Sequence, residues 1–582
     1  MSSQPVATRW LLAGCALLLL AGCNGGSSPP GNGGATGGDG SGGSTGTGSS
    51  SSGSGGSGGG TPWFEDATAA SGLDFQHVYG TETRYWFPEL TGPGAGLFDA
   101  DGDGDLDAYL LQSGDLSGPS AQGANVYFEN LGDGSYVDGT ARAGLGDRGY
   151  GQGCSVADAD GDGDLDVHVT NVGPNVLYRN EGNGRFTDVS ESARVQDPGW
   201  SLGSAFLDHD ADGDLDLFVT NYLVWSIETD IKCSNPQGNR DYCGPKSYQT
   251  VAPDTLYRND GELRFTDVSS EAGLRKAFGT GMGIACADFD EDGRLDVYVA
   301  NDGRSNQLWM NRGGQFEDEA LLRGCALNSQ GQAEASMGVV AGDLDTDGDL
   351  DLFMTHLRGE TNTVYLNNRG SFRDRSGRSK LGKSSLAFTG FGVALVDFDQ
   401  DGNQDLYITN GRVMDKLPRY SEENVYAEPD LLYRGQGGGS FVEQGPRGGT
   451  AEERLDSGRG VAAGDVDGDG DIDLLVSNWG GPARLLKNVA ASGHWLRVDP
   501  RRRDGNQALG AVVTLQLGDR SVSQLVQGSL SYCSASDPRA HFGLGATTKV
   551  DSITVAWPGG AKEAFPGSEV DRTLVLTEGG GA

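Results

Sequence analysis

The sequence predicts an all-β fold, in which a seven-bladed β-propeller closed by an N-terminal strand is followed by a small β-sandwich. Three observations predict it. An Asp-rich loop of nine residues occurs seven times, a strand-like run follows each copy, and a strand that the seventh copy lacks stands before the first one. A ring completed by its own first strand requires that order, whereas an open array of repeats does not.

Composition excludes two classes of protein. The chain has 582 residues, with 43 Lys and Arg against 82 Asp and Glu, and a formal net charge of −39. A chain this acidic repels a phosphate backbone, so we expect no nucleic-acid partner. Only 36% of the residues are hydrophobic and the mean hydropathy is −0.41, which excludes a protein with many membrane spans. Eight cysteines are too few for a disulfide scaffold of this length.

Residues 1–23 are predicted to be a lipoprotein signal peptide. The apolar run 10–21 is too short for a permanent membrane span, and it ends in Leu20, Ala21, Gly22 and Cys23. This tetrad resembles the lipobox of bacterial lipoproteins, which implies lipidation of Cys23 and anchoring in the outer membrane or at the cell surface of a bacterium. The alternative is an ordinary cleaved signal peptide with an incidental cysteine. Either way, the protein leaves the cytoplasm.

Residues 24–61 are predicted to be a disordered Gly/Ser linker. Between positions 25 and 60, 18 of 36 residues are Gly and the only charged residue is Asp39. Such a segment has too little apolar surface to fold. We expect a flexible tether between the lipid and the folded part.

The seven Asp-rich loops are the central motif. We number them 1–7 in chain order and number the positions within each loop 1–9. Positions 1, 3, 5 and 9 are Asp in all seven loops, and position 7 is Asp in five. The acidic residues are Asp99, Asp101, Asp103, Asp105 and Asp107; Asp158, Asp160, Asp162, Asp164 and Asp166; Asp208, Asp210, Asp212, Asp214 and Asp216; Asp288, Asp290, Asp292 and Asp296; Asp343, Asp345, Asp347, Asp349 and Asp351; Asp397, Asp399, Asp401 and Asp405; and Asp465, Asp467, Asp469, Asp471 and Asp473.

This spacing predicts up to seven Ca²⁺ sites. Position 6 is Gly in every loop, which permits a sharp turn that brings carboxylates from both limbs to one point. Oxygen ligands in this number suit Ca²⁺ better than Zn²⁺. We expect position 7 to bind through its backbone carbonyl, so Arg294 in loop 4 and Asn403 in loop 6 keep that ligand. One such loop alone could be a solvated hairpin, but seven copies with one spacing argue against it.

The loops are not EF-hands. An EF-hand loop ends with a bidentate Glu at position 12, and position 12 is apolar in all seven copies. The residues after position 9 have the composition of strands, so each loop joins two strands.

The longer repeat defines the blades. A Gly lies five residues before the first Asp of every loop, as expected where another backbone approaches closely. After the loop come a second strand, a third strand and a Phe-x-Asp strand. The seventh repeat lacks the last of these, and an extra copy begins at Phe64. The sequence thus predicts a propeller over residues 62–489, with first Asp residues 50 to 80 positions apart.

The loops resemble the FG-GAP/VCBS repeats of integrin α-subunit propellers. The order of elements is more similar to that of bacterial relatives of cartilage acidic protein 1, whose propeller is followed by an ASPIC/UnbV domain. The resemblance implies Ca²⁺ in the loops. In residues 490–582, short alternating runs between Gly and Pro turns independently predict a small β-sandwich.

Several other residues carry weaker expectations. Cys233 and Cys243 are predicted to form a disulfide bond, because the protein is exported. His209 is expected to point away from the metal of loop 3, and residues 501–503, all Arg, are expected to form a solvated loop. His77 and Glu89 are either structural residues or part of a site on one face. The polar residue five positions after each last Asp either lines the channel mouth or bonds its own turn.

The function predicted from these features is that of a lipid-anchored, calcium-stabilised binding or adhesion module with a protein or glycan ligand. No catalytic motif is evident, and repeated rather than unique carboxylate clusters favour binding. The alternative is a carbohydrate-processing enzyme or a lectin that uses a propeller face or the insertions at 222–254 and 411–430.

Overall fold

The computed structural model describes residues 60–582 except 81–82, 119–122 and 491–492. The signal peptide, Cys23 and the linker up to residue 59 therefore lie outside the described residues. In the described part of the chain, no helix combines the length and the apolar character that a bilayer crossing requires.

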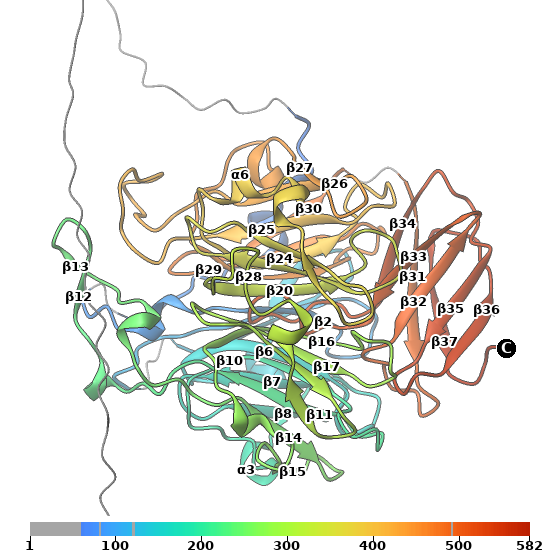
Figure 1. The fold of residues 1–582 in the computed structure, drawn as a ribbon, viewed down its shortest axis with the longest axis horizontal. Helices are drawn as coiled ribbons and strands as arrows, with labels where there is room; N and C mark the ends of the chain where they lie inside the picture. The colour runs from blue at the N-terminus through green and yellow to red at the C-terminus, as the bar shows by residue number, and fades with distance from the viewer. Residues whose placement is uncertain (1–59, 81–82, 119–122, 491–492) are drawn as a thin grey trace, which may run out of the picture. The chain divides into compact units, whose positions relative to one another are not determined.

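Seven four-stranded antiparallel sheets within the described residues form the blades of a propeller (Figure 1). Blades 1–3 consist of β2 (Ala95–Phe98), β3 (Asp107–Leu110), β4 (Val126–Asn130) and β5 (Tyr136–Asp138); β6 (Gly151–Ala157), β7 (Asp166–Asn171), β8 (Val176–Asn180) and β9 (Phe186–Asp188); and β10 (Ser201–Leu207), β11 (Asp216–Asn221), β14 (Thr255–Asn259) and β15 (Phe265–Asp267). Blades 4 and 5 consist of β16 (Gly281–Ala287), β17 (Asp296–Asn301), β18 (Gln307–Asn311) and β19 (Phe316–Asp318), and of β20 (Ser336–Gly342), β21 (Asp351–His356), β22 (Thr363–Leu366) and β23 (Arg373–Asp374). Blades 6 and 7 consist of β24 (Gly390–Val396), β25 (Asp405–Asn410), β26 (Leu431–Gly435) and β27 (Phe441–Glu443), and of β28 (Gly458–Gly464), β29 (Asp473–Asn478), β30 (Arg484–Asn488) and β1 (Phe64–Asp66).

The N-terminal strand completes the seventh blade, as the sequence predicts. β1 pairs antiparallel with β30, with Phe64 opposite Asn488 and Asp66 opposite Leu486. Phe64 is buried against the rings of Phe398 and Tyr407, whose centroids lie 5.2 and 5.7 Å away. The first strands of adjacent blades contact one another around a closed circle, from β2 to β28 and back to β2. The predicted all-β fold and ring closure are confirmed.

The axial glycines are the points where adjacent blades approach most closely. A Cβ on Gly203 of β10 would lie 2.6 Å from the carbonyl oxygen of Met282 on the next blade, and one on Gly153 would lie 2.7 Å from that of Leu202. Side chains essentially never occupy such positions. The close backbone approach predicted for these glycines is confirmed.

The Phe-x-Asp strands end in a local cap. In blades 1–5 and in β1, the Asp side chain accepts the backbone N–H of the residue two positions later. A turn follows in each case, because this bond favours one; it is a single helical turn except in blade 3, where a turn at 269–273 precedes a short helix. These turns are α1 (Thr68–Ser71), α2 (Thr140–Ala143), α3 (Ser190–Ala193), α4 (Ala320–Arg323) and α5 (Ser376–Ser379), with η4 (Leu274–Lys276) in blade 3.

Long insertions lie on the face opposite the Asp loops. Strands alternate in direction within a blade, so the connection from the second to the third strand leaves from the other end. The insertion between β11 and β14 contains β12 (Cys233–Ser234), β13 (Arg240–Asp241), η2 (Ile227–Thr229) and η3 (Pro245–Ser247). The remaining short helices are η1 (Phe87–Leu90), α6 (Gly382–Ser385) and η5 (Arg447–Gly449).

The C-terminal domain is a two-sheet β structure. One sheet has the order β34-β31-β37 and the other β33-β32-β35-β36, and a shared hydrophobic core includes Leu496, Val513 and Ile553. The strands are β31 (His494–Arg501), β32 (Val512–Leu517), β33 (Arg520–Leu525), β34 (Ala540–Gly545), β35 (Ser552–Ala556), β36 (Lys562–Pro566) and β37 (Arg572–Thr577).

A segment of this domain passes through the propeller channel. Residues 526–537, which we call the axial segment, link β33 to β34. Ala535 exchanges backbone hydrogen bonds with β2, and Ser531 exchanges them with Val339 of β20. Tyr532 is fully buried and donates to the carbonyl of Thr91 at 2.6 Å. Thr91 precedes the first residue of β2 in the chain. The axial segment therefore extends from the C-terminal domain through the ring towards the face that carries the insertions.

Candidate metal centre

Each Asp-rich loop connects the first and second strands of one blade. Its position-9 Asp is the first residue of the second strand in all seven blades of the described chain. The position-6 glycines have φ values between +89° and +108°, a conformation that favours Gly. The predicted sharp turn is therefore present in every loop.

The position-1 carboxylate folds each loop onto itself. In all seven loops of the described region, one of its oxygens accepts the N–H of the position-6 glycine, with N–O distances of 2.6–3.2 Å. This bond joins the two limbs of the loop.

The position-9 carboxylate joins each loop to its blade. One oxygen accepts the N–H of the position-2 residue, and the other accepts an N–H at the end of the third strand. In loop 5, for example, Asp351 accepts from Leu344 at 2.9 Å and from Asn367 at 2.7 Å. The last Asp thus has a structural role in addition to its predicted role as a ligand.

The position-3 carboxylate has an oxygen with no partner. The Oδ1 atom is buried and makes no hydrogen bond to any described residue in loops 1, 4, 5, 6 and 7, where the residues are Asp101, Asp290, Asp345, Asp399 and Asp467. Leaving such an acceptor buried and unpaired costs about 1–3 kcal/mol or more. The same atom is left without a partner in five independent loops, as expected if it faces a cation.

The donor atoms converge as the sequence predicts. Ligand oxygens of positions 1, 3 and 5 lie within 4.8 Å of one another in loops 1 and 3, and those of positions 1, 3 and 9 do so in loops 2 and 4. All are carboxylate oxygens, the donor type that Ca²⁺ prefers. These residues therefore fit a hard divalent cation, and the carbonyl at position 7 remains a predicted ligand.

Burial raises the pKa of these carboxyl groups. The pKa of Asp343 at position 1 rises to about 7, first through burial and then through the charge of Asp347. The pKa of Asp166 at position 9 rises to about 8, again mainly through burial. A bound cation favours the ionised form and would offset both effects.

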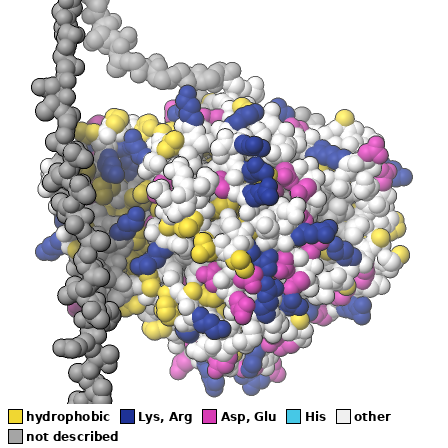
Figure 2. Space-filling view, in the orientation of Figure 1, with side chains coloured by type: hydrophobic (Ala, Val, Ile, Leu, Met, Phe, Trp, Pro, Cys, Tyr) yellow, Lys and Arg dark blue, Asp and Glu magenta, His cyan; other side chains and the backbone are white. Residues whose placement is uncertain are grey.

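The seven loops have different cationic neighbours. Arg323 pairs with Asp290 of loop 4 at 2.9 Å, Arg434 with Asp399 of loop 6 at 2.8 Å, and Lys487 with Asp467 of loop 7 at 2.9 Å. Arg294 also pairs with the position-5 Asp of its own loop. Figure 2 shows Lys and Arg side chains interspersed among Asp and Glu rather than gathered in a separate basic patch. The loops are therefore not electrostatically equivalent.

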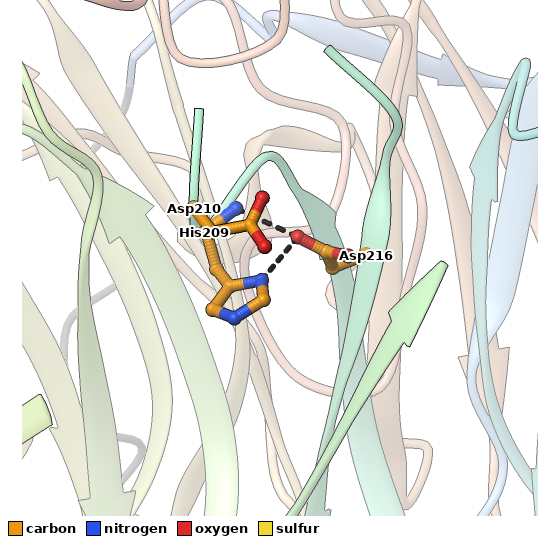
Figure 3. A group of neighbouring side chains, drawn as sticks. All are labelled: His209, Asp210 and Asp216. Atoms are coloured by element: carbon orange, nitrogen blue, oxygen red, sulfur yellow. Dashed lines mark hydrogen bonds and ion pairs between the residues drawn. The ribbon is translucent and has the colours of Figure 1, made fainter. Parts of the chain in front are cut away.

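His209 lies differently from the expectation. Its side chain was expected to point away from the predicted metal site of loop 3, but its Nδ1 atom contacts Oδ2 of Asp216, the position-9 carboxylate (Figure 3). Burial lowers the pKa of His209, but the bond to Asp216 and the loop carboxylates outweigh burial and raise it. Position 2 projects towards position 9 because its own N–H bonds the same oxygen.

Two other expectations concern cysteine and arginine. Cys233 and Cys243 form a disulfide bond that closes the insertion of blade 3. The solvated loop expected at 501–503 is wrong for Arg501, which is the last residue of strand β31, and for Arg502, whose Nη1 donates to the carbonyl of Gly213 in loop 3 at 3.0 Å. Arg503 beside it is exposed. A basic run cannot reveal which of its members meets an acidic loop distant in sequence.

The polar residues at the ends of the second strands bond their own connections. Asn171, Asn410 and Asn478 are buried, and each donates its amide to a proline carbonyl in the connection that follows. These residues do not line an open channel mouth, so the structural alternative is correct for them.

His77 and Glu89 are buried beneath the insertions. Both ring nitrogens of His77 have partners, Ser113 and the N–H of Gly480. Glu89 accepts a hydrogen bond from Tyr242 of the 222–254 insertion at 2.9 Å, and burial raises its pKa to about 8. The two residues therefore belong to the packing of the face opposite the metal loops.

Sequence reasoning missed Arg459. It is fully buried on β28, with its guanidinium 4.0 Å from the ring centre of Phe391 and its Nε donating to the carbonyl of Leu90. Burial lowers its pKa to about 10. A signal existed, because the residue before the axial glycine is apolar in five of the seven blades and is Arg in this one.

Comparison with known families and relatives agrees with the repeat structure. The FG-GAP-like repeat family matches residues 99–169, 158–219, 238–299, 288–354, 343–408 and 425–476, together more than half of the chain. The ASPIC and UnbV family matches residues 502–582.

Curated relatives and solved structures are also similar to this chain. Human cartilage acidic protein 1 is 30% identical over 335 residues, 55% of this chain and 48% of the relative, and the Xenopus tropicalis protein is 26% identical over 346 residues, 58% and 41%. The chain thus spans about half the length of the curated relatives it matches or less. Among solved structures, a Bacillus licheniformis rhamnogalacturonan lyase (13% identity, 72% of this chain and 76% of that chain, TM-score 0.36) and the six-bladed Aleuria aurantia lectin (11%, 61% and 96%, TM-score 0.31) are similar.

The chain therefore belongs to the FG-GAP-like repeat family, carries a C-terminal ASPIC/UnbV domain, and is a distant homologue of cartilage acidic protein 1.

Proposed function

We propose that this protein is a calcium-binding propeller that acts outside the cytoplasm as a lipid-anchored binding or adhesion module. Calcium in the Asp-rich loops stabilises the blades, and the face with the insertions binds the partner. The observation that carries the calcium assignment is the buried position-3 oxygen without a partner in five loops. A bound Ca²⁺ would supply the missing interaction to each of them.

Counting bound calcium in matched variants tests the metal assignment. Asp345→Asn removes a position-3 charge from loop 5, where the unpartnered oxygen lies. Glu317→Gln removes the same charge from an exposed position on β19. We expect equilibrium dialysis at limiting calcium to show about one ion fewer for Asp345→Asn and no change for Glu317→Gln. Equal calcium contents would contradict the assignment at loop 5.

The insertion face is the better candidate for a partner. The insertions at 222–254 and 411–430 meet there, since Asp241 accepts from Tyr426 and from the N–H of Asp415, both at 2.9 Å. Exposed apolar side chains project from both insertions, with Val224 60% and Leu417 64% exposed. Exposed apolar groups on an otherwise polar surface favour protein or glycan contact.

Retention of the calcium-loaded protein on an array of immobilised glycans and on whole bacterial cells tests this face. Leu417→Ser removes an apolar contact on the insertion, and Val137→Ser is the matched control on outer strand β5, where Val137 is 46% exposed. We expect only Leu417→Ser to reduce retention. Equal retention of both variants would place the binding surface elsewhere.

The anchor is tested at Cys23. Metabolic labelling with an alkyne fatty acid should modify the protein and not its Cys23→Ser variant. An unlabelled wild-type protein released in soluble form would contradict lipidation and favour an ordinary signal peptide.

The alternative, a carbohydrate-active enzyme on the insertion face, has one observation in its favour. Glu89 is a buried carboxyl with a pKa of about 8, in contact with an insertion. Such groups occur at catalytic sites as well as in structural networks. Loss of polysaccharide cleavage in Glu89→Gln would support the enzyme, and absence of cleavage by the wild type would favour the binding module.

A further inference from the structure

The C-terminal domain contacts the metal loops in a regular way. It donates a hydrogen bond to the carbonyl oxygen of the position-6 glycine in loops 3, 4, 6 and 7. The donors are Arg502 to Gly213 at 3.0 Å, the N–H of Gly559 to Gly293 at 2.9 Å, Arg520 to Gly402, and His541 to Gly470 at 3.0 Å. Four unrelated donors thus bind the same atom of four different loops.

Among the residues that the structure describes, the other three loops have no donor at this carbonyl oxygen. A Cβ on Gly104, Gly163 or Gly348, the position-6 glycines of loops 1, 2 and 5, would meet no atom within 4 Å. A Cβ on Gly470 would collide with the ring of Trp495, and one on Gly293 would lie 3.0 Å from Gly560. The domain therefore donates to the position-6 carbonyl of four loops and approaches others at different positions, since a Cβ on Gly161 of loop 2 would lie 3.4 Å from Nδ2 of Asn506.

We propose that the face formed by loops 3, 4, 6 and 7 is a calcium-dependent docking surface whose partner is this chain's own C-terminal domain. The inference rests on the proposed calcium binding. The glycine carbonyl belongs to the peptide bond between positions 6 and 7, and the residues on either side of the glycine, at positions 5 and 7, are predicted to bind the metal. Loss of the metal would release that peptide, since repulsion between the carboxylates would then be uncompensated.

The negative charge of the loops partly opposes this effect, because it favours docking of cationic side chains when the metal is lost. Arg497 of β31 donates to Asp465 of loop 7 at 2.7 Å, Arg502 lies 3.7 Å from Asp208 of loop 3, and empty loops would attract both guanidinium groups more strongly. Loops 3 and 7, however, each have five carboxylates, more than one Ca²⁺ neutralises, so the ion and the arginine can be held together. In loops 4 and 6 the contacts given above are to carbonyl oxygens. There the geometry of the loop, and not its charge, determines whether calcium strengthens or weakens docking.

Docking also closes the channel. The axial segment lies between the inner strands, where Cys533 is buried with its carbonyl accepting from the N–H of Cys154 at 3.3 Å. Burial raises the pKa of the Cys533 thiol, which keeps it protonated and unreactive. Release of the domain would withdraw this segment and expose Cys533. Cys325, buried in the core between blades 4 and 5, would stay protected.

Alkylation of the whole protein with iodoacetamide, followed by peptide mass spectrometry, tests the proposal. Below the melting temperature of the calcium-free propeller, we expect chelation of calcium to raise the alkylation rate of Cys533 about fivefold or more, the lower end of typical coupling between sites, and to leave Cys325 unchanged. Metal analysis of the same samples separates the two proposals. No calcium in the loaded protein would overturn both, whereas calcium that leaves without a change at Cys533, or with slower alkylation, would overturn the coupling alone.

Matched arginine variants test the same coupling without chelation. Arg502→Ala removes the donor to loop 3, and Arg503→Ala changes its exposed neighbour. Because coupling is reciprocal, Arg502→Ala should raise the calcium concentration that half-protects Cys533, and Arg503→Ala should not. If chelation unfolds the propeller and so exposes Cys325, the comparison of the two arginine variants still tests the coupling, because it needs no chelator. Equal midpoints for the two variants would overturn the proposal.

Discussion

The axial glycines offer a direct test of how the ring closes. Replacing Gly203 by Ala would place a Cβ 2.6 Å from the carbonyl oxygen of Met282, on the first strand of the next blade. An ordinary contact of this kind is at least about 3.2 Å, so the two backbones must separate by more than half an ångström. The carbonyl cannot rotate away, because it also accepts the hydroxyl of Thr220 at 3.2 Å. Overpacking of this kind costs about 1–3 kcal/mol, and we expect the upper end.

Gly96→Ala is the matched control. Gly96 lies on the first strand of blade 1, and the nearest atoms to its Cβ would be the Cys154 sulfur at 3.3 Å and two ring carbons of Phe98 at 3.6 Å. Loss of backbone freedom in the unfolded chain would offset the small contact cost by about 0.4–1 kcal/mol. Urea unfolding in saturating calcium, followed by tryptophan fluorescence, compares the two. Equal stabilities for both variants would refute the claim that blades meet at the axial glycines.

Two further predictions concern the closing strand and the buried acid. Phe64→Ala should destabilise the propeller by about 3–5 kcal/mol, because it empties the buried site on β1, whereas Glu65→Ala on the exposed side of the same strand should have little effect; equal urea midpoints would count against ring closure by β1. Burial raises the pKa of Glu89 in the folded state to about 8; the hydrogen bond from Tyr242 and the charge of Arg84 lower this pKa, and the charge of Asp230 raises it. The folded state therefore holds a proton that the unfolded state loses from about pH 4.5 upward. The contribution of Glu89 to the free energy of unfolding is therefore greatest at low pH and falls as pH rises to about 8. Over this range, the free energy of unfolding of Glu89→Gln should rise relative to that of the wild type by at most about 5 kcal/mol. A constant difference between pH 5 and pH 9 in chemical unfolding would contradict the raised pKa.

The repeated features of this protein could be predicted from the sequence because each has a local physical cause. The position-6 glycine is needed for a positive φ, and the axial glycine is needed for close approach of two backbones. The Phe-x-Asp element ends in an Asp that caps the following turn. Counting these elements predicted that the strand at Phe64 completes the seventh blade, and the pairing of β1 with β30 confirms it.

The features that the sequence did not predict arise where distant segments meet. Arg502, Arg520 and His541 contact the loops through tertiary packing, and no periodicity connects them to Gly213, Gly402 and Gly470. His209 was misjudged because side-chain direction in a tight loop depends on backbone hydrogen bonds that spacing does not reveal. The axial segment was not predicted either, since residues 526–537 resemble an ordinary loop between two strands until the channel around them is known.

Thermal unfolding of the protein with calcium and after chelation tests the central claim most directly. A site with a Kd of about 0.1 mM at about 1 mM calcium contributes roughly 1.4 kcal/mol, so seven sites would contribute about 10 kcal/mol, comparable with the whole stability of a typical domain. The account predicts a large fall in melting temperature on chelation that calcium reverses and magnesium does not. An unchanged melting temperature in a sample that metal analysis shows to be free of calcium would contradict it.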